Sequence, residues 1–387
     1  MSAPSKPTDY KRRILLVATG LTPQVVTETV YALIRQQPAF IPTEIHLVTT
    51  KEGAERARLS LLSADPGWFH RLRQDYQLPP IAFDSERIHV LQDAQGNPLD
   101  DIRSPQDNEA AADALTTLVR DLTADDQSAL HVSLAGGRKT MGYYLGYALS
   151  LFGRSQDRLS HVLVSAPFES SWSFFYPTPY ERIIETSDKK LVDCRDAEVT
   201  LAEIPFVRLR NGLPPRFLKG QARMSDVVAA ANRMLQPPQL VLDVAQKRVW
   251  ADDIEITLTP TEFALLLWLA ERVKAGKPEV DRSAPEACDE FLEQAGRVMN
   301  KMSGDYERLE KSLLGDKEEK KSARKGDRVL TAKYFEPHKS RINKAFEESL
   351  GEQAAQRYAI ENVGKRSDPH RSRYRLTLKD EQIIIRE

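Results

Sequence analysis

Glycines, cations and hydroxyls are concentrated in one short segment of the sequence, 133–140, which reads SLAGGRKT. Its two glycines leave backbone amides accessible, and an arginine and a lysine stand directly beside them. Amides and cations in this arrangement suit a phosphodiester group. The segment has neither the GxxxxGK[ST] spacing of a Walker A loop nor the GxGxxG spacing of a dinucleotide site. The candidate ligand-binding residues are Ser133, Ala135, Gly136, Gly137, Arg138, Lys139 and Thr140.

A second segment of similar character, TGLTP, occupies residues 19–23. Gly20 permits close approach of the backbone, and Thr22 offers a hydroxyl near a predicted helix N-terminus, where free amides attract phosphate. The alternatives are that Thr22 and Pro23 only cap a helix, and that 136–140 is a glycine turn with solvated cations. We favour ligand binding because both segments are expected at one edge of one sheet. The candidates here are Gly20, Leu21, Thr22, Pro23 and Gln24.

Alternating strands and helices position both segments. The apolar run ILLVA at 14–18 is typical of a strand buried on both faces, and a helix is expected at 24–36. Further strands are predicted at 44–49, 87–91, 129–134, 159–164 and 199–208, and further helices at 52–64, 108–122 and 141–152. This alternation predicts an α/β fold with a Rossmann-like parallel sheet. Ligands of such sheets bind beyond the carboxyl ends of the strands, where both segments lie.

A different pattern follows a predicted linker helix and Pro237-Pro238. Small antiparallel strands are expected at 240–242, 248–250 and 254–258, helices at 262–274, 288–314 and 335–350, and two strands at 358–360 and 374–378 around a basic turn. Helices followed by a basic hairpin are typical of a winged helix. We therefore expect a ligand-binding domain at 1–222, a linker helix at 223–238 and a winged helix-turn-helix domain at 239–387.

Composition restricts the location and the partners. No run approaches the roughly 20 apolar residues of a membrane span, and the N-terminus has no secretory pattern, so no membrane partner is expected. Cys194 and Cys288 form neither a metal-binding CxxC pair nor a disulfide framework, which favours a cytoplasmic location and no metal cofactor. Basic residues outnumber acidic ones more than twofold between 320 and 379. A polyanionic partner is therefore plausible for the C-terminal part alone.

The two loops and their surroundings resemble the CARF (CRISPR-associated Rossmann fold) domains of type III CRISPR systems, over about 12–235. The resemblance rests on GLTPQ, SLAGGRKTMG and neighbouring text such as ALSLFGR at 148–154, DRLSHVLV at 157–164 and FFYP at 174–177. It implies a homodimer that binds one cyclic oligoadenylate across its two-fold axis. Gly20–Gln24 and Ser133–Thr140 would then form the ligand site.

Some CARF domains are also ring nucleases, and the resemblance extends to that activity. In this reaction a ribose 2′-OH attacks the adjacent phosphate without a metal, while the protein aligns the groups and stabilises charge. Lys139 is our candidate for stabilising the transition state, supported by Arg138 and Thr22. Asp101, Arg103 and Asn108 either support this site or cap the turn before a helix. His131 and His161 lie within apolar strands, so we expect core histidines there rather than a general base.

The C-terminal part resembles a winged helix-turn-helix of the response-regulator type. ITLTPTEFALLL at 256–267 is similar to its opening strand and first helix, and KSRINKAF at 339–346 is similar to its recognition helix. A charged insert at about 278–328 departs from that family and leaves the geometry of any contact with double-stranded DNA open. The candidate DNA-binding residues are Lys339, Arg341, Lys344, Arg366, Arg371 and Arg373.

Two functions follow from these expectations. The first is an enzyme, a dimeric metal-independent ring nuclease that senses and linearises cyclic tetra-adenylate and so ends an antiviral signal. The alternative is a ligand-gated, DNA-binding transcription regulator that does not cleave its ligand. A two-fold dimer fits a ring of four or six adenylates equally well, so the preference for four comes from the resemblance.

Overall fold

The computed structural model describes residues 6–169, 171–186, 188–220, 223–233, 236–282, 284–313, 330–364 and 373–387. Two compact units divide the chain: unit 1 comprises Met1–Arg210 with Gln221–Asp226, and unit 2 comprises Asn211–Gly220 with Val227–Glu387. The domain boundaries expected from the sequence stay predictions. No helix in the described ranges is long and apolar enough to cross a membrane.

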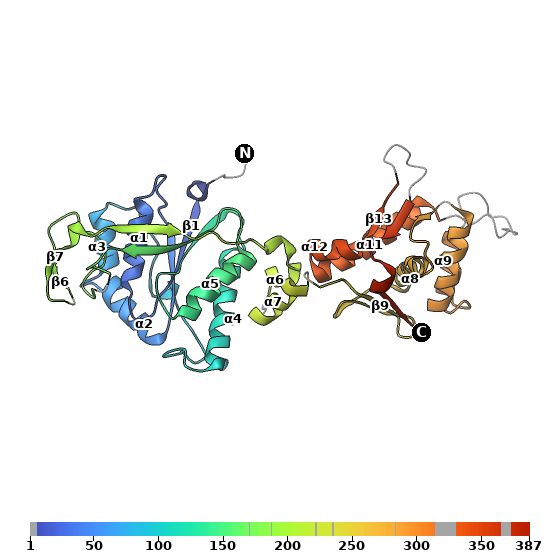
Figure 1. Cartoon of the computed structure of the whole chain (residues 1–387), viewed down its shortest axis with the longest axis horizontal. Coiled ribbons are helices and arrows are strands. Elements are labelled where there is room, and N and C mark those ends of the chain that lie inside the picture. The colour runs from blue at the N-terminus through green and yellow to red at the C-terminus, as the bar shows by residue number, and fades with distance from the viewer. Residues whose placement is uncertain are drawn as a thin grey trace. The chain divides into compact units, whose positions relative to one another are not determined.

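A six-stranded sheet forms the centre of unit 1 (Figure 1). Its strands, in spatial order, are β3 (Ile88–Val90), β2 (Glu44–Thr49), β1 (Arg12–Ala18), β4 (Ser128–Ser133), β5 (Arg158–Val164) and β8 (Val199–Glu203). All neighbours are parallel except β5 and β8. The structure confirms the expected α/β fold with a mostly parallel sheet. β1 and β4 are buried over nearly their whole length, which explains their continuous apolar sequences.

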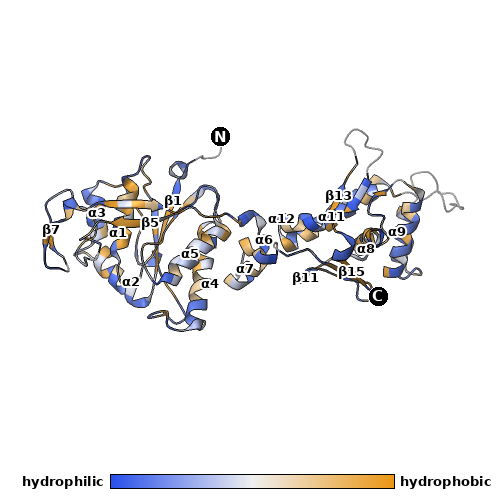
Figure 2. Ribbon diagram, viewed as in Figure 1, coloured by the Kyte–Doolittle hydropathy of each residue, from blue (hydrophilic) through white to orange (hydrophobic). Residues whose placement is uncertain are grey.

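Among the described residues, five helices pack around this sheet. They are α1 (Gln24–Ile34), α2 (Lys51–Ala57), α3 (Trp68–Asp75), α4 (Pro105–Leu122) and α5 (Lys139–Phe152). Four of them (α1, α2, α4 and α5) correspond to helices predicted from the sequence. Leu15 and Val17 of β1 share one core with Val26 and Val30 of α1. α4 and α5 lie side by side, and the apolar segments of all these elements can be followed in Figure 2. From β1 the chain adds β2 and β3 on one side of the sheet. It then crosses back and adds β4, β5 and β8 on the other side of β1.

Several boundaries differ from those expected in unit 1. The helix predicted at 52–64 is α2, which ends at Ala57 and continues as a π-helical turn over Arg58–Leu62. β8 stops at Glu203 instead of residue 208. Two elements were not predicted: α3, and a small hairpin of β6 (Ile183–Glu185) and β7 (Leu191–Asp193). α3 has the short apolar stripe Trp68, Phe69 and Leu72, which is buried against the sheet core.

Unit 2 combines helices with two small sheets. The first sheet contains β11 (Ile254–Ile256), β10 (Arg248–Ala251), β9 (Leu240–Asp243) and β15 (Ile383–Arg386), and the second contains β12 (Val280–Asp281), β14 (Arg373–Leu376) and β13 (Ile360–Asn362). The helices are α6 (Pro215–Leu218), α7 (Met224–Arg233, which begins in unit 1), α8 (Pro260–Lys274), α9 (Pro285–Val298), α10 (Gly304–Ser312), α11 (Ala332–Leu350) and α12 (Glu352–Ala355). The side chain of Thr259 accepts a hydrogen bond from the Glu262 amide and so caps α8.

The single helix expected at 288–314 is wrong. The segment forms α9 and α10, separated by a break at Met299–Ser303. The hydroxyl of Ser303 accepts a hydrogen bond from the Tyr306 amide at 3.2 Å, which begins a new helix. Two strands, β12 and β15, were also missed. β15 pairs in parallel with β9, a partner more than a hundred residues away in sequence.

Candidate functional site

The two glycine-containing loops meet at the carboxyl ends of β1 and β4. These strands are neighbours in the sheet. The strand that follows β1 lies on one side of the pair and the strand that follows β4 lies on the other, so the two loops flank a topological switch point. A side chain added at Gly20 would place its Cβ 3.5 Å from Gly137 Cα. The structure therefore brings the two candidate segments into direct contact, as their places in the sheet predict.

Close packing explains the two adjacent glycines of the second loop. A Cβ on Gly136 would lie 2.8 Å from the carbonyl oxygen of Ala18, a distance that requires the backbone to move. Gly137 has a φ of +87°, a conformation that residues with a side chain rarely adopt. Gly136 is therefore required by close packing against the end of β1, and Gly137 is required by its backbone conformation.

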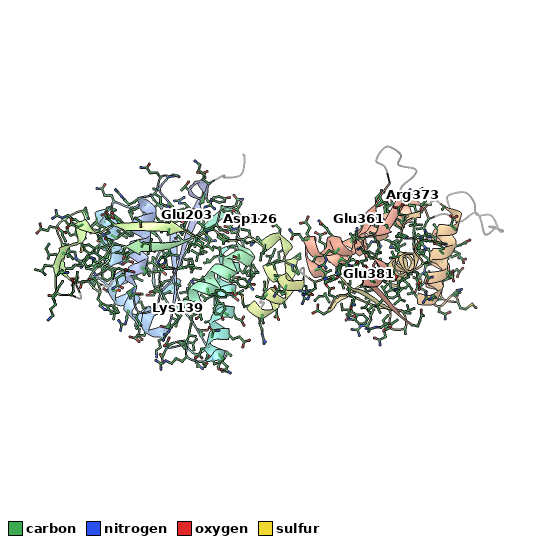
Figure 3. All side chains as sticks on the ribbon, viewed as in Figure 1. Asp126, Lys139, Glu203, Glu361, Arg373 and Glu381 are labelled. Atoms are coloured by element: carbon green, nitrogen blue, oxygen red, sulfur yellow. The ribbon has the colours of Figure 1, made fainter. Side chains whose placement is uncertain are left out.

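The start of α5 presents free amides and positive charge together. Its N-cap residue is Arg138, whose side chain does not cap the helix, and no acidic residue lies in the first turn. The backbone amides of a helix start therefore combine with the positive end of the helix dipole. Lys139 and Thr140 are exposed here, and Figure 3 shows Lys139 at the surface of unit 1. No described residue pairs with the Lys139 ammonium.

An ion pair fixes Arg138, the neighbour of Lys139. The guanidinium donates from Nε to Asp101 Oδ1 at 2.8 Å and from Nη2 to Asp101 Oδ2, which makes the pair bidentate. This hydrogen-bonded cation, helped by the backbone amide of Ile102, lowers the pKa of Asp101 to about 2. Arg138 keeps 59% of its side chain exposed. Asp101 therefore orients a cation that still faces solvent.

The other candidates near the turn before α4 have different roles. Arg103 donates more weakly to Asp101, at 3.4 Å. Asn108 donates to the Tyr144 hydroxyl at 2.6 Å and so ties α4 to α5. The cap of α4 is a reciprocal pair of Ser104 and Asp107. Asp101 therefore supports the candidate site. The residues that cap the turn are Ser104 and Asp107 rather than Asp101, Arg103 or Asn108.

Burial divides the remaining loop candidates into two groups. Ser133 is fully buried and lies 3.1 Å from the Thr29 hydroxyl, so its side chain packs between β4 and α1. Pro23 and Gln24 are also buried. Leu21 and Thr22 are exposed, while Gly20 and Ala135 are half-buried. Only some of the candidate residues are therefore accessible to a ligand at the surface.

A cavity of about 250 Å³ adjoins the two loops and is lined by residues of α1 and β5 and by Glu169, Ser171 and Trp172. Thr22 and Ala135 contribute to it from the loops. Gln24 donates from Nε2 to the Trp172 carbonyl at 3.1 Å, whereas its buried Oε1 has no hydrogen-bond partner among the described residues. Burial, together with the negative charge of Glu169, raises the pKa of Glu28 to about 8.

Glu28 and Trp172 were not among the candidates from the sequence. Glu28 is 7% exposed, although it is a carboxyl residue in the middle of an otherwise apolar or uncharged helix. That isolated charge, one turn after Gln24, was the available signal. Trp172 belongs to an aromatic segment that the sequence marks only as a loop, and its place beside α1 depends on long-range folding.

The two strand histidines differ. His131 is buried beside the Ser160 hydroxyl at 2.7 Å, and burial lowers its pKa to about 3, so it is a core histidine as expected. His161 is half-buried and contributes to the cavity wall.

Within the described ranges, no group of three His, Cys, Asp or Glu side chains could hold a metal ion.

Candidate DNA-contacting cations of unit 2 have acidic neighbours. On α11, Lys339 is 17% exposed, pairs with Glu336 at 2.7 Å and lies over the Tyr374 ring. Arg341 and Lys344 on the same helix are 60% and 72% exposed and lie 3.6 and 3.5 Å from Glu262 and Glu348 respectively. Arg373, labelled in Figure 3, lies 3.5 Å from Glu279. Arg366 and Arg371 are outside the described residues.

Comparison with known proteins gives one family. The model of the family described as CRISPR-associated protein NE0113 matches residues 22–237, more than half of the chain. No curated protein matches. A solved structure titled "Enterococcus italicus Csm6 bound to cyclic hexa-2'-fluoro-hexa-dAMP" is 12% identical, with a TM-score of 0.26, and the match covers 78% of this chain and 53% of that chain. This chain thus spans about half the length of that protein.

Proposed function

Because the chain belongs to the family of CRISPR-associated protein NE0113, we propose that it senses a cyclic oligoadenylate and cleaves it. The ligand is cyclic tetra-adenylate, bound by unit 1 in a homodimer. One ring lies across the two-fold axis, and each protomer contributes the same two loops. Unit 2 is a winged helix-turn-helix domain in this proposal.

A single observation carries the proposal: the two loops pack together where β1 and β4 end, so closely that a Cβ added at Gly20 would lie 3.5 Å from Gly137 Cα. Around this contact the start of α5 offers free amides, and Arg138 and Lys139 offer positive charge. An anion placed there meets donors that are already oriented, so it does not have to organise them. A phosphodiester of the ring matches this arrangement in charge and in hydrogen-bonding capacity.

Cleavage requires only an in-line attack within the ring. The 2′-oxygen of a ribose loses its proton to solvent and forms a bond to the adjacent phosphorus, while the bond from phosphorus to the 5′-oxygen breaks. The leaving 5′-oxygen takes a proton from solvent, and the products carry a 2′,3′-cyclic phosphate and a 5′-hydroxyl. Lys139 stabilises the charge that builds on the phosphoryl oxygens. Arg138 and Thr22 hold the phosphate in place.

The direct test is incubation of the protein with cyclic tetra-adenylate in EDTA, with the products separated by chromatography. We expect linear products that end in a 2′,3′-cyclic phosphate. Binding without any linear product would remove the nuclease half of the proposal and leave the sensor. Absence of both binding and product would remove the proposal as a whole.

Asp101 is expected to act through Arg138. Arg138→Ala should weaken binding of cyclic tetra-adenylate about tenfold or more, since a hydrogen bond to a charged group is worth roughly 1.5–3 kcal/mol. Asp101→Ala should weaken it less, because the cation remains but loses its orientation. In the Arg138→Ala background, Asp101→Ala should have no further effect. Isothermal titration of the four proteins measures this cycle, and additive losses would show that Asp101 acts independently.

The alternative function, a ligand-gated regulator that binds DNA, rests on the exposed cations Arg341 and Lys344 of α11. If these residues contact phosphates, Arg341→Glu with Lys344→Glu should weaken DNA binding and reduce the slope of log affinity against log salt by about two. Lys247→Glu, a charge reversal at an exposed site elsewhere in unit 2, is the matched control. Mobility shifts with DNA from upstream of the CRISPR locus measure both. No shift at low salt, with or without ligand, would exclude this function.

A further inference from the structure

The cavity that adjoins the loops contains polar groups that the proposed cleavage does not use. Glu28 and Gln24 line it from successive turns of α1, and both are more than nine-tenths buried. The Gln24 Oε1 has no hydrogen-bond partner among the described residues. An unpaired buried acceptor destabilises the protein, and a ligand that donates a hydrogen bond to it would recover that loss. The cavity is therefore built to receive a polar partner.

Its size fits one nucleobase. The volume of about 250 Å³ is below the roughly 300–1,000 Å³ of pockets that enclose a whole drug-sized ligand. Trp172 lies in its wall and remains 60% exposed, with the Arg56 guanidinium 5.6 Å from the centre of the indole ring. Exposed aromatic rings commonly stack on unpaired bases. A planar group that entered from the loops would meet this ring.

We propose that this cavity selects adenine, with Glu28 and Gln24 reading one edge of the base and Trp172 stacking on its face. This inference rests on the proposed function, because the phosphates at the two loops bring the base to the cavity. Thr22 and Ala135 belong both to those loops and to the cavity wall. A ring held at the loops can therefore place a base in the cavity without leaving the phosphate site.

Glu28 supplies a hydrogen-bonding edge for the base, and Gln24 Oε1 supplies the discrimination. Its neighbours in the cavity wall are the carboxylate of Glu169 and the half-buried imidazole of His161. With a pKa of about 8, Glu28 is neutral at pH 7 and offers one O–H donor beside one carbonyl acceptor. Adenine presents an acceptor beside the N6 amino donor on both of its exposed edges. Guanine and hypoxanthine carry an oxygen acceptor at the equivalent position, which clashes with Gln24 Oε1.

Two substitutions separate this role from simple packing. Glu28→Gln keeps a donor beside an acceptor, so it should bind cyclic tetra-adenylate within a few-fold of wild type. Glu28→Leu removes both and should bind at least tenfold more weakly. Glu28→Leu should also be at least as stable as wild type to heat at pH 8, because it removes a buried carboxyl, so weak binding would not reflect unfolding. Replacement of cyclic tetra-adenylate by its inosine counterpart should cost wild type at least tenfold.

The pH dependence gives a further readout. Wild-type affinity should fall as the pH rises through about 8, when Glu28 ionises, whereas the affinity of Glu28→Gln should lack this fall. The raised pKa also means that the contribution of Glu28 to the stability of the folded protein is fully present below pH 4.5 and is lost as the pH rises through about 8. Glu28→Gln should lack this decline in the free energy of unfolding, measured without ligand.

The outcomes distinguish this inference from the function it rests on. Isothermal titration uses cyclic tetra-adenylate, its inosine counterpart and adenosine as probes. If wild type binds the adenine ring but Glu28→Leu binds it equally well, or if the inosine ring binds as tightly, the adenine site is wrong and the sensor stands. If wild type binds neither the ring nor adenosine, both are wrong. Selective loss in Glu28→Leu, with retention in Glu28→Gln, supports the inference.

Discussion

Lys139→Ala is expected to reduce the rate of cleavage of cyclic tetra-adenylate by about 10²–10³, the loss typical when one preorganised donor to a developing anion is removed. The reason is the position of Lys139 in the first turn of α5, exposed and without a described partner. It is free to follow the charge as it moves onto the phosphoryl oxygens, whereas Arg138 is held by Asp101. Ligand affinity should change much less than the rate. Single-turnover kinetics in EDTA separate the two quantities.

Two controls accompany this variant. Lys139→Arg keeps the positive charge but not the compact ammonium, so it should recover part of the rate. Lys190→Ala removes an exposed lysine that pairs with Asp188 beside the β6–β7 hairpin, and it should leave the rate unchanged. A Lys139→Ala protein that cleaves at the wild-type rate would show that this residue does not stabilise the transition state.

Asp157→Asn is expected to cause the largest loss of stability, about 3–5 kcal/mol, because it leaves the buried charge of Arg154 without its partner. Asp157 is fully buried. Its two carboxylate oxygens accept from the Leu130 amide at 2.9 Å and from the Arg154 amide, Nε and Nη2 at 2.7–2.9 Å. An asparagine could replace only part of this arrangement. Chemical denaturation of the two proteins measures the difference.

The ion pair of Arg154 and Asp157 joins the end of α5 to β4 and β5, so its loss should act on the whole sheet. Asp126→Asn, at an exposed aspartate in the preceding loop, is the matched control and should change the free energy of unfolding by less than about 0.5 kcal/mol. A loss below about 1 kcal/mol in Asp157→Asn would contradict this role. Arg154 and Asp157 lie in the segments 148–154 and 157–164, and the structure gives both residues a role in holding the sheet together.

The central sheet could be predicted because its signal is local. Buried parallel strands such as β1 and β4 are continuous apolar runs, and their sequence identifies them without knowledge of their partners. The break between α9 and α10 was missed because the amphipathic pattern was read across it, whereas α9 ends at Val298 and Ser303 begins a new helix. β15 was missed because its four residues become a strand only by pairing with distant β9.

The same distinction applies to the candidate site. The two loops were found from residue types and from their places after predicted strands, and the structure brings them into contact. The pairing of Asp101 with Arg138 joins residues 37 positions apart, so the sequence could offer Asp101 only as one of two alternatives. Glu28 was missed because its importance depends on what surrounds it. Burial and Glu169 change its pKa, and neither can be read from the helix alone.

Titration of the intact protein with cyclic tetra-adenylate in EDTA tests the central claim most directly, with heat and stoichiometry measured by calorimetry and the mass of the complex by light scattering. We expect one ring for every two chains, in a complex with the mass of a dimer, and binding that is about tenfold or more weaker when Arg138 is replaced by alanine. No heat with rings of four or six adenylates, or binding that survives the loss of Arg138 unchanged, would contradict it.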